Sequence, residues 1–181
     1  MPEPEEKKPG EEESALATEL VKHLAISLRN VKGYPPGHPF VQKTLRETFG
    51  LVRDALGGMD ELAVCIFESQ VMVEDIRVDS TTLPAAIGFL DALRKVDVRS
   101  LNFYQALKME ELESLFSILA MDKLSVKDGG GVDRLLREKG VQGIKVNQVE
   151  FGIISKRERS REVEKVVLSL EAFNRLLASP R

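Results

Sequence analysis

The sequence predicts an α+β fold, with a helical hairpin at the N-terminus, a mixed sheet of four or five strands with helices, and an amphipathic helix at the C-terminus. Two observations lead to this prediction. Apolar residues recur every three or four positions in the longer segments, as on one face of a helix, whereas shorter β-branched segments alternate as strands do. The segments follow in the order ααββαβααβ, which is typical of helices and strands layered around one core.

The first two segments predict the hairpin. A helix is expected from Ser14, whose side chain can cap its start, to Gly33, which closes it in the left-handed conformation. Residues 33–39 contain three prolines and predict a rigid loop. Pro39 suits the first turn of a second helix, which ends at the glycine pair 57–58. Two helices joined by so short a loop lie antiparallel.

The next segments predict the sheet and its helices. The run from Leu62 to Phe67 is apolar on both faces, which indicates a central strand. A meander through residues 71–73 and 76–78 is expected to follow it. The other elements are expected as helices at 83–93, 109–121 and 132–139 and as strands at 98–103 and 144–154.

Composition narrows the class of protein. The 181 residues are 43% hydrophobic and 30% charged, so one packed domain is expected. The longest charge-free segment, residues 80–90, is much shorter than the ~20 residues of a membrane span. A single cysteine, Cys65, excludes an internal disulfide. We therefore expect a bacterial cytoplasmic protein with no membrane contact, metal or cofactor.

Charge divides the chain into three parts. Residues 1–13 hold six glutamates against two lysines and predict a disordered acidic tail. Residues 14–155 are the expected α+β domain, and residues 156–181 the expected C-terminal helix. Outside the tail, 24 basic residues face 23 acidic ones, a balance that argues against nucleic-acid binding. Arg157, Arg159 and Arg161 lie in a run interspersed with glutamates, which favours a solvent-exposed, ion-paired helix face; contact with nucleic acid or acidic lipid is the alternative.

Tyr34 and His38 flank the double proline of the hairpin loop. A general base needs a partner that orients it, and the sequence supplies none. We expect His38 to cap the second helix and Tyr34 to pack over the hairpin, with contact to a small molecule or peptide as the alternative. Cys65 is expected to be a buried, inert thiol. Because no catalytic constellation emerges, the sequence predicts a protein that is not an enzyme.

A glycine run, Gly129, Gly130 and Gly131, precedes the short helix at 132–139. Amides at the start of a helix can hold an anion, but the run lacks the Gly-Lys-Ser/Thr ending of a phosphate-binding loop. A structural turn is therefore favoured. Binding of a small ligand is the alternative.

The C-terminal segment carries an apolar seam whose members recur at steps of three and four, as in a short coiled coil. Monomers rarely leave such a stripe uncovered. Docking on its own domain, self-association and a link to a following domain are three interpretations. The seam consists of Val163, Val166, Leu170, Phe173 and Leu177.

Three segments of the chain resemble an uncharacterised bacterial domain that lies ahead of HEAT-type helical repeats or HD-type phosphohydrolase modules in multidomain proteins. They are residues 33–45 (GYPPGHPFVQKTL), residues 98–103 (VRSLNF) with the following Glu110-Glu111-Leu112, and residues 140–149 (GVQGIKVNQV). The resemblance spans residues 14–154. It implies an accessory or interaction domain and no catalytic residues.

The sequence therefore predicts a regulatory protein–protein interaction or oligomerisation module, which docks a partner or a second copy through the C-terminal seam and the hairpin. A sensor of a small anion or nucleotide, bound near Gly129–Gly131 or His38, is the alternative.

Overall fold

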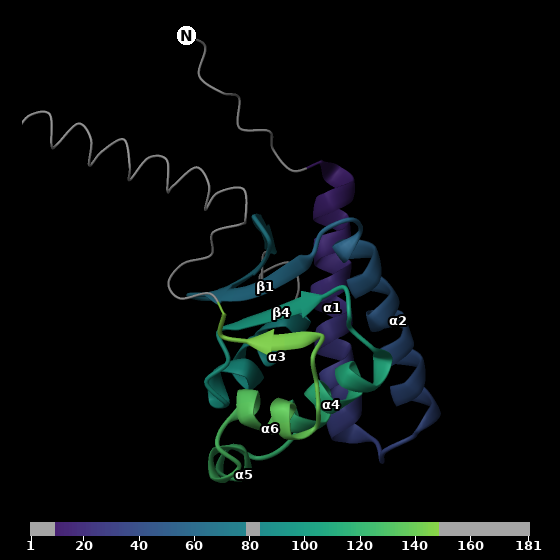
Figure 1. Ribbon diagram of the computed structural model, residues 1–181. Coiled ribbons are helices and arrows are strands. Elements are labelled where there is room, and N and C mark those ends of the chain that lie inside the picture. Colours follow the sequence, from purple (N-terminus) through teal and green to yellow (C-terminus); the bar gives the residue numbers. More distant parts are fainter. Residues whose placement is uncertain (1–9, 79–83, 149–181) are drawn as a thin grey trace, which may run out of the picture.

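The computed structural model describes residues 10–78 and 84–148, in which a five-stranded sheet is covered by helices on one face (Figure 1). The predicted α+β class is confirmed. Along the sheet the strand order is β3-β2-β1-β4-β5. The strands are β1 (Glu61–Phe67), β2 (Gln70–Val73), β3 (Ile76–Val78), β4 (Ser100–Tyr104) and β5 (Ile144–Val146). The helices are α1 (Glu11–Gly33), α2 (Pro39–Leu56), α3 (Pro84–Lys95), α4 (Met109–Leu119), α5 (Lys123–Asp128) and α6 (Val132–Glu138).

Every pair of neighbouring strands in the sheet is antiparallel, so the prediction of a mixed sheet is wrong. The meander accounts for two of these pairs, β1 with β2 and β2 with β3, whereas the other two depend on how the chain returns to pair β4 with β1 and then β5 with β4. Glu68 and Glu74 take φ values of 52° and 54°, the left-handed conformation that tight hairpin turns require. The chain therefore reverses twice within a few residues. Each strand of the meander pairs with its predecessor, and β1 is central as predicted.

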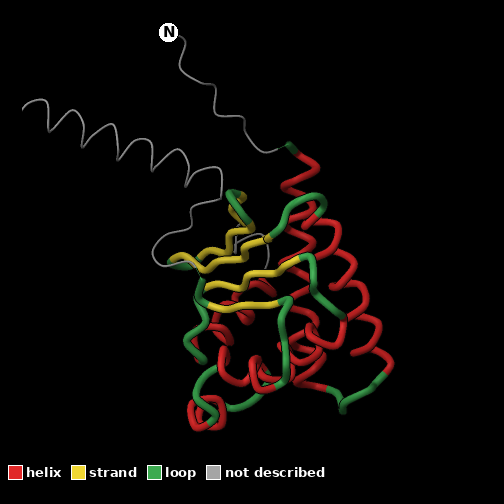
Figure 2. Tube along the Cα trace, viewed as in Figure 1, coloured by secondary structure: helices red, strands yellow, loops and turns green. Residues whose placement is uncertain are grey.

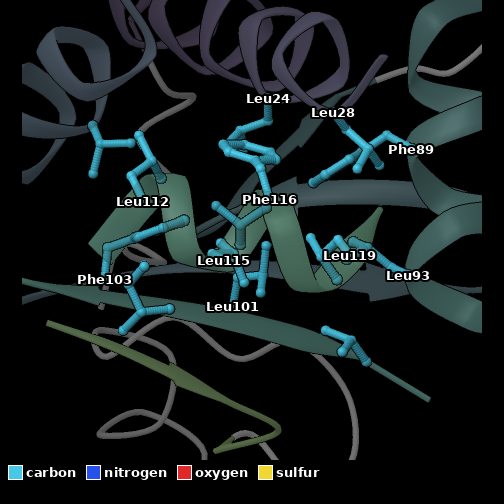
Figure 3. Packing of buried hydrophobic residues seen from close by; sticks show 14 of the residues in the cluster. Leu24, Leu28, Phe89, Leu93, Leu101, Phe103, Leu112, Leu115, Phe116 and Leu119 are labelled. Carbon is cyan, nitrogen blue, oxygen red and sulfur yellow. The ribbon is translucent and has the colours of Figure 1, made fainter. Parts of the chain in front are cut away.

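The core lies between the sheet and the helices, and α4 is its middle layer. Figure 3 shows Leu115 and Leu119 on the side of α4 that faces β4, whereas Phe116 lies on the side that faces α1. Phe116, Leu115 and Leu24 of α1 are fully buried. Because α4 has apolar residues on both sides, it joins the helical hairpin to the sheet in one core. Figure 2 shows the same arrangement of helices beside the strands.

The hairpin of α1 and α2 has the predicted elements but different ends for α1. The helix begins at Glu11 rather than Ser14, and Gly10 precedes it without a side-chain cap. Three glutamates in the first turn favour this earlier start, because their negative charges face the positive end of the helix dipole. The acidic residues 11–13 are thus helical rather than part of the predicted disordered tail, whose residues 1–9 lie outside the described residues.

The end of α1 also differs from the prediction. Gly33 is the last helical residue and does not take the left-handed conformation. Instead Tyr34 ends the helix in an extended conformation, with φ of −127° and ψ of 151°. Pro35 explains this, because a proline disfavours the helical conformation of the residue before it.

Helix α5 was not predicted. The last strand was predicted over residues 144–154, of which β5 covers Ile144–Val146 and residues 149–154 lie outside the described residues. The predicted C-terminal helix with its seam also lies outside the described residues. In the described ranges, no helix combines the length with the apolar character that crossing a bilayer requires.

Candidate functional site

The turn between α1 and α2 is the best-defined candidate surface. Residues 35–38 form a β-turn in which the His38 N–H donates to the Pro35 carbonyl at 3.1 Å. Pro36 has the fixed φ that suits the second position of such a turn, and Gly37 takes a φ of 80° at the third. The proline ring and the hydrogen bond therefore restrict the backbone between the two helices, and Gly37 supplies the positive φ that the turn needs.

His38 connects this turn to α2. Its Nδ1 atom accepts a hydrogen bond from the Phe40 N–H at 3.2 Å, so the imidazole caps the helix N-terminus as predicted. Pro39 occupies the first turn, where its missing N–H leaves no bond unmade. The cap therefore orients the His38 imidazole over the first turn of α2.

Three rings gather on this turn, and we call Tyr34, His38 and Phe40 the aromatic turn. Tyr34 stacks on His38 with ring centroids 4.5 Å apart, and Phe40 lies 5.7 Å from Tyr34 and 5.3 Å from His38. Although the rings contact one another, Tyr34 is 41% and Phe40 58% exposed to solvent. Tyr34 thus packs on the turn, as predicted, but also presents an apolar face to water.

Basic residues surround the aromatic turn in the sequence. From Arg29 to Arg46 the chain has four lysines and arginines and no aspartate or glutamate. Arg29, Lys32, Lys43 and Arg46 are exposed. Two carboxylates contact this segment: Glu47 lies 3.9 Å from Lys43, and Glu113 of α4 accepts from Gln42 at 3.4 Å. The end of the hairpin is therefore aromatic and positively charged.

A cleft of about 630 Å³ is the second candidate. It lies where α3 leads into β4, where α5 leads into α6, and where β5 ends. Gly130 and Gly131, which the sequence singled out, line the cleft with φ values of 89° and 94°. Gly129 is not among its lining residues, and a side chain there would collide with Leu135.

The structure does not bring the two predicted loops together. The lining of the cleft includes no residue of the aromatic turn, and Figure 1 shows α5 apart from the loop between α1 and α2. The seam residues Val163, Val166, Leu170, Phe173 and Leu177 lie outside the described ranges. Cys65 is buried, as expected.

Two of the three segments that carried the family resemblance form one hydrogen-bonded unit: residues 98–103 with Glu110–Leu112, and residues 140–149. Glu111 accepts bonds from the N–H groups of Gln142 at 2.8 Å and Gly143 at 3.3 Å. Asn147 accepts from the Arg99 N–H at 2.7 Å and donates to the Asp97 carbonyl at 2.9 Å. These polar residues hold β4, α4 and β5 together, which is a structural role. The third segment, residues 33–45, contains the aromatic turn.

Sequence reasoning missed Phe40 and the lysines of the cleft. Phe40 follows Pro39 at the start of α2 and is not on the buried stripe of that helix. An aromatic residue at such a position could have been recognised in the sequence as an exposed one. The lysines come from α3 and α5, and no sequence spacing relates them.

No group of three histidine, cysteine or carboxylate residues in the described ranges could hold a metal ion. Comparison with known proteins finds no matching family model, no matching curated protein and no matching solved structure.

Proposed function

We propose that this chain is a protein-interaction module, which docks an acidic segment of a partner protein on the aromatic turn. The observation that carries the proposal is the exposure of Tyr34 and Phe40 on a rigid backbone. Aromatic residues dominate binding energy at interfaces, and a surface that is already ordered loses little entropy on binding. The module is proposed to be regulatory and non-enzymatic; the family resemblance implies an accessory or interaction domain without catalytic residues.

The charge of the hairpin end selects the partner. Arg29, Lys32 and Lys43 lie close in sequence to the aromatic turn, so an acidic segment gains attraction there and a basic one is repelled. A second copy presenting the same hairpin end is disfavoured for the same reason, because like charges would meet. The partner chemistry is therefore a run of carboxylates with an apolar side chain that packs on Tyr34 and Phe40.

Fluorescence anisotropy with synthetic peptides tests this proposal. The probe is a labelled peptide in which glutamates flank one leucine, and its controls replace the glutamates by lysines or the leucine by serine. The acidic leucine peptide is expected to bind most tightly, with an affinity that falls as salt is added. A preference for the lysine peptide, or equal affinity for all three peptides, contradicts the proposal.

Matched variants locate the binding surface. Replacing both Tyr34 and Phe40 by alanine is expected to weaken binding at least about tenfold, since interface anchors cost ~2 kcal/mol or more when truncated. Ile87→Ala is the control, because Ile87 is 51% exposed on α3 and lies outside the aromatic turn. Equal losses in the double variant and the control contradict docking at the hairpin end.

A further inference from the structure

Strand β1 is apolar on both faces, and the described helices cover one of them (Figure 1). Leu62 and Val64 belong to the core beneath the helices. Successive residues of a strand point to opposite sides, so Ala63, Cys65 and Phe67 lie on the other face of the sheet. A strand that is apolar on both faces is typical of a sheet that is covered on both sides. The second face of β1 therefore has the composition of a buried surface.

The register of the sheet brings further residues to this second face. Cys65 pairs with Met72 of β2 and with Ser100 of β4. Ala63 pairs with Asn102 of β4. Directly paired residues share a face of the sheet. We call this surface the open face; it is apolar on β1 and β2 and polar on β4, and it consists of Ala63, Cys65, Phe67, Met72, Ser100 and Asn102.

The accessible part of the open face is its apolar part. Phe67 is 45% exposed, and Ala63 and Met72 are half-buried. The smaller side chains of Cys65 and Ser100 lie between the strands and are buried. A helix that docks here would rest on Ala63, Phe67 and Met72.

The polar part of the open face already has its hydrogen bonds. The Asn102 amide donates to the carboxylate of Glu61, and the Ser100 hydroxyl donates to the Asn102 side-chain oxygen at 3.3 Å. The Tyr104 hydroxyl also donates to Glu61, at 3.3 Å. Because these groups bond one another, a helix can cover them without leaving them unpaired.

The seam is the segment of this chain whose length and connection fit the open face. As a helix, residues 163–177 would be ~22 Å long, and the four spacings between five strands span ~19 Å. Residues 147–162 connect β5 to the seam and reach up to ~50 Å when extended. Strands β1 and β2 lie only two and three spacings from β5, or ~10–15 Å. The connection is therefore long enough to place the seam over both strands.

We propose that the seam packs on the open face of its own chain and adds a helix to the second face of the sheet. The seam and the open face are both apolar, so each removes the other from water. A second copy competes less well, because the connection holds the seam of the same chain at a far higher effective concentration. No residue of the aromatic turn takes part, so this proposal does not depend on the docking function.

Amide NMR of the full chain with charged seam variants tests the proposal. Val166→Asp with Leu170→Asp places two charges in the seam, whereas Ala172→Asp with Ser179→Asp places two on the opposite side of the predicted helix. The seam pair is expected to shift the amide signals of residues 63–67, and the control pair to leave them in place. Unchanged signals in the seam pair overturn the proposal. So do equal shifts in both pairs.

Hydrogen exchange in the seam tests the same contact from the side of the sheet. Phe67→Ser with Met72→Ser removes exposed apolar side chains from the open face, and the control Ile87→Ser removes one that is 51% exposed on α3. Amide exchange in residues 163–177 is expected to become at least about tenfold faster in the open-face pair and less than about twofold faster in the control. Protected amides of α4 show that both variants remain folded. Fast exchange of the seam in the unchanged protein, or equal exchange in all three proteins, overturns the proposal.

Analytical ultracentrifugation distinguishes the chain's own sheet from a second copy as the partner of the seam. The proposal predicts the mass of a monomer at every concentration, both for the unchanged protein and for the seam pair. A dimer that forms as the concentration rises and dissociates in the seam pair assigns the seam to a second copy and overturns the proposal.

Discussion

The imidazole of His38 stacks on the ring of Tyr34 with the centroids 4.5 Å apart and the ring planes inclined by 25°. The same imidazole accepts the Phe40 N–H bond that caps α2. One side chain thus orders both the start of a helix and the aromatic surface beside it. The stability of the hairpin and the shape of the proposed docking surface are therefore linked through His38.

Replacing His38 by alanine is expected to destabilise the fold by about 1 kcal/mol, the usual value of a lost helix cap. His38→Asn keeps an acceptor at the cap position but not the ring. It is expected to recover most of that stability without restoring the stack. Urea unfolding of the wild type, His38→Ala and His38→Asn measures the free energy of unfolding of each. Equal destabilisation by the two substitutions would show that the cap contributes nothing.

A buried polar pair between α1 and α2 gives a second prediction. The hydroxyl groups of Ser27 and Thr48 are 2.8 Å apart, and Thr48 also donates to the His23 carbonyl at 3.2 Å. Thr48→Val leaves the Ser27 hydroxyl buried without this partner, at an expected loss of about 1–3 kcal/mol. Adding Ser27→Ala is expected to recover part of it. A double-mutant cycle by thermal unfolding measures the coupling, and strictly additive losses contradict the pairing.

Gly143 makes a close approach that only glycine allows. A Cβ there would lie 2.7 Å from the Leu107 backbone nitrogen, and Gly143 also donates to Glu111. Gly143→Ala is expected to destabilise the protein by about 1–3 kcal/mol through overpacking. Gly58 is the control, because a Cβ there meets nothing within 4 Å and its alanine variant should stay within about 0.5 kcal/mol. Similar denaturation midpoints for the two variants would refute the close packing.

The N-cap of α5 predicts a pH dependence. The Ser125 hydroxyl and backbone N–H both donate to the Asp122 carboxylate, and they lower its pKa from the ordinary 3.8. Because the pKa is lower in the folded state, the ionised Asp122 cap stabilises α5 at a pH above the unfolded-state pKa. This stabilisation is lost as the pH falls through the folded-state pKa. Carboxyl NMR titration should find the Asp122 midpoint below 3.8 and find it closer to that value in Ser125→Ala. An unchanged midpoint in the variant would contradict this cause.

Local rules predicted the parts of the fold in which neighbouring residues determine the structure. Helix α2 begins at Pro39 and ends before the glycine pair 57–58, as the sequence predicts. Gly140, in the left-handed conformation, follows the end of α6, also as predicted. Helix α5 escaped prediction because its six residues include a single buried one, Val126, so it has no apolar periodicity. The sequence did carry one indication of α5, namely Asp122 three residues before Ser125, the spacing at which a side chain caps the start of a helix.

Long-range geometry accounts for the other differences. The direction of β4 relative to β1 depends on how the chain crosses behind the sheet, and no pattern within either strand records it. The cleft likewise assembles Lys95 and Lys127 from helices that are far apart in the sequence. The aromatic turn was partly predictable, since Tyr34, His38 and Phe40 lie within seven consecutive residues.

Amide NMR mapping of the acidic leucine peptide on the full chain tests the docking account most directly. The account predicts that the largest shifts fall on residues 32–43 around the aromatic turn and that they vanish when Tyr34 and Phe40 are both alanine. Shifts centred elsewhere, or shifts that persist in the double variant, would contradict it.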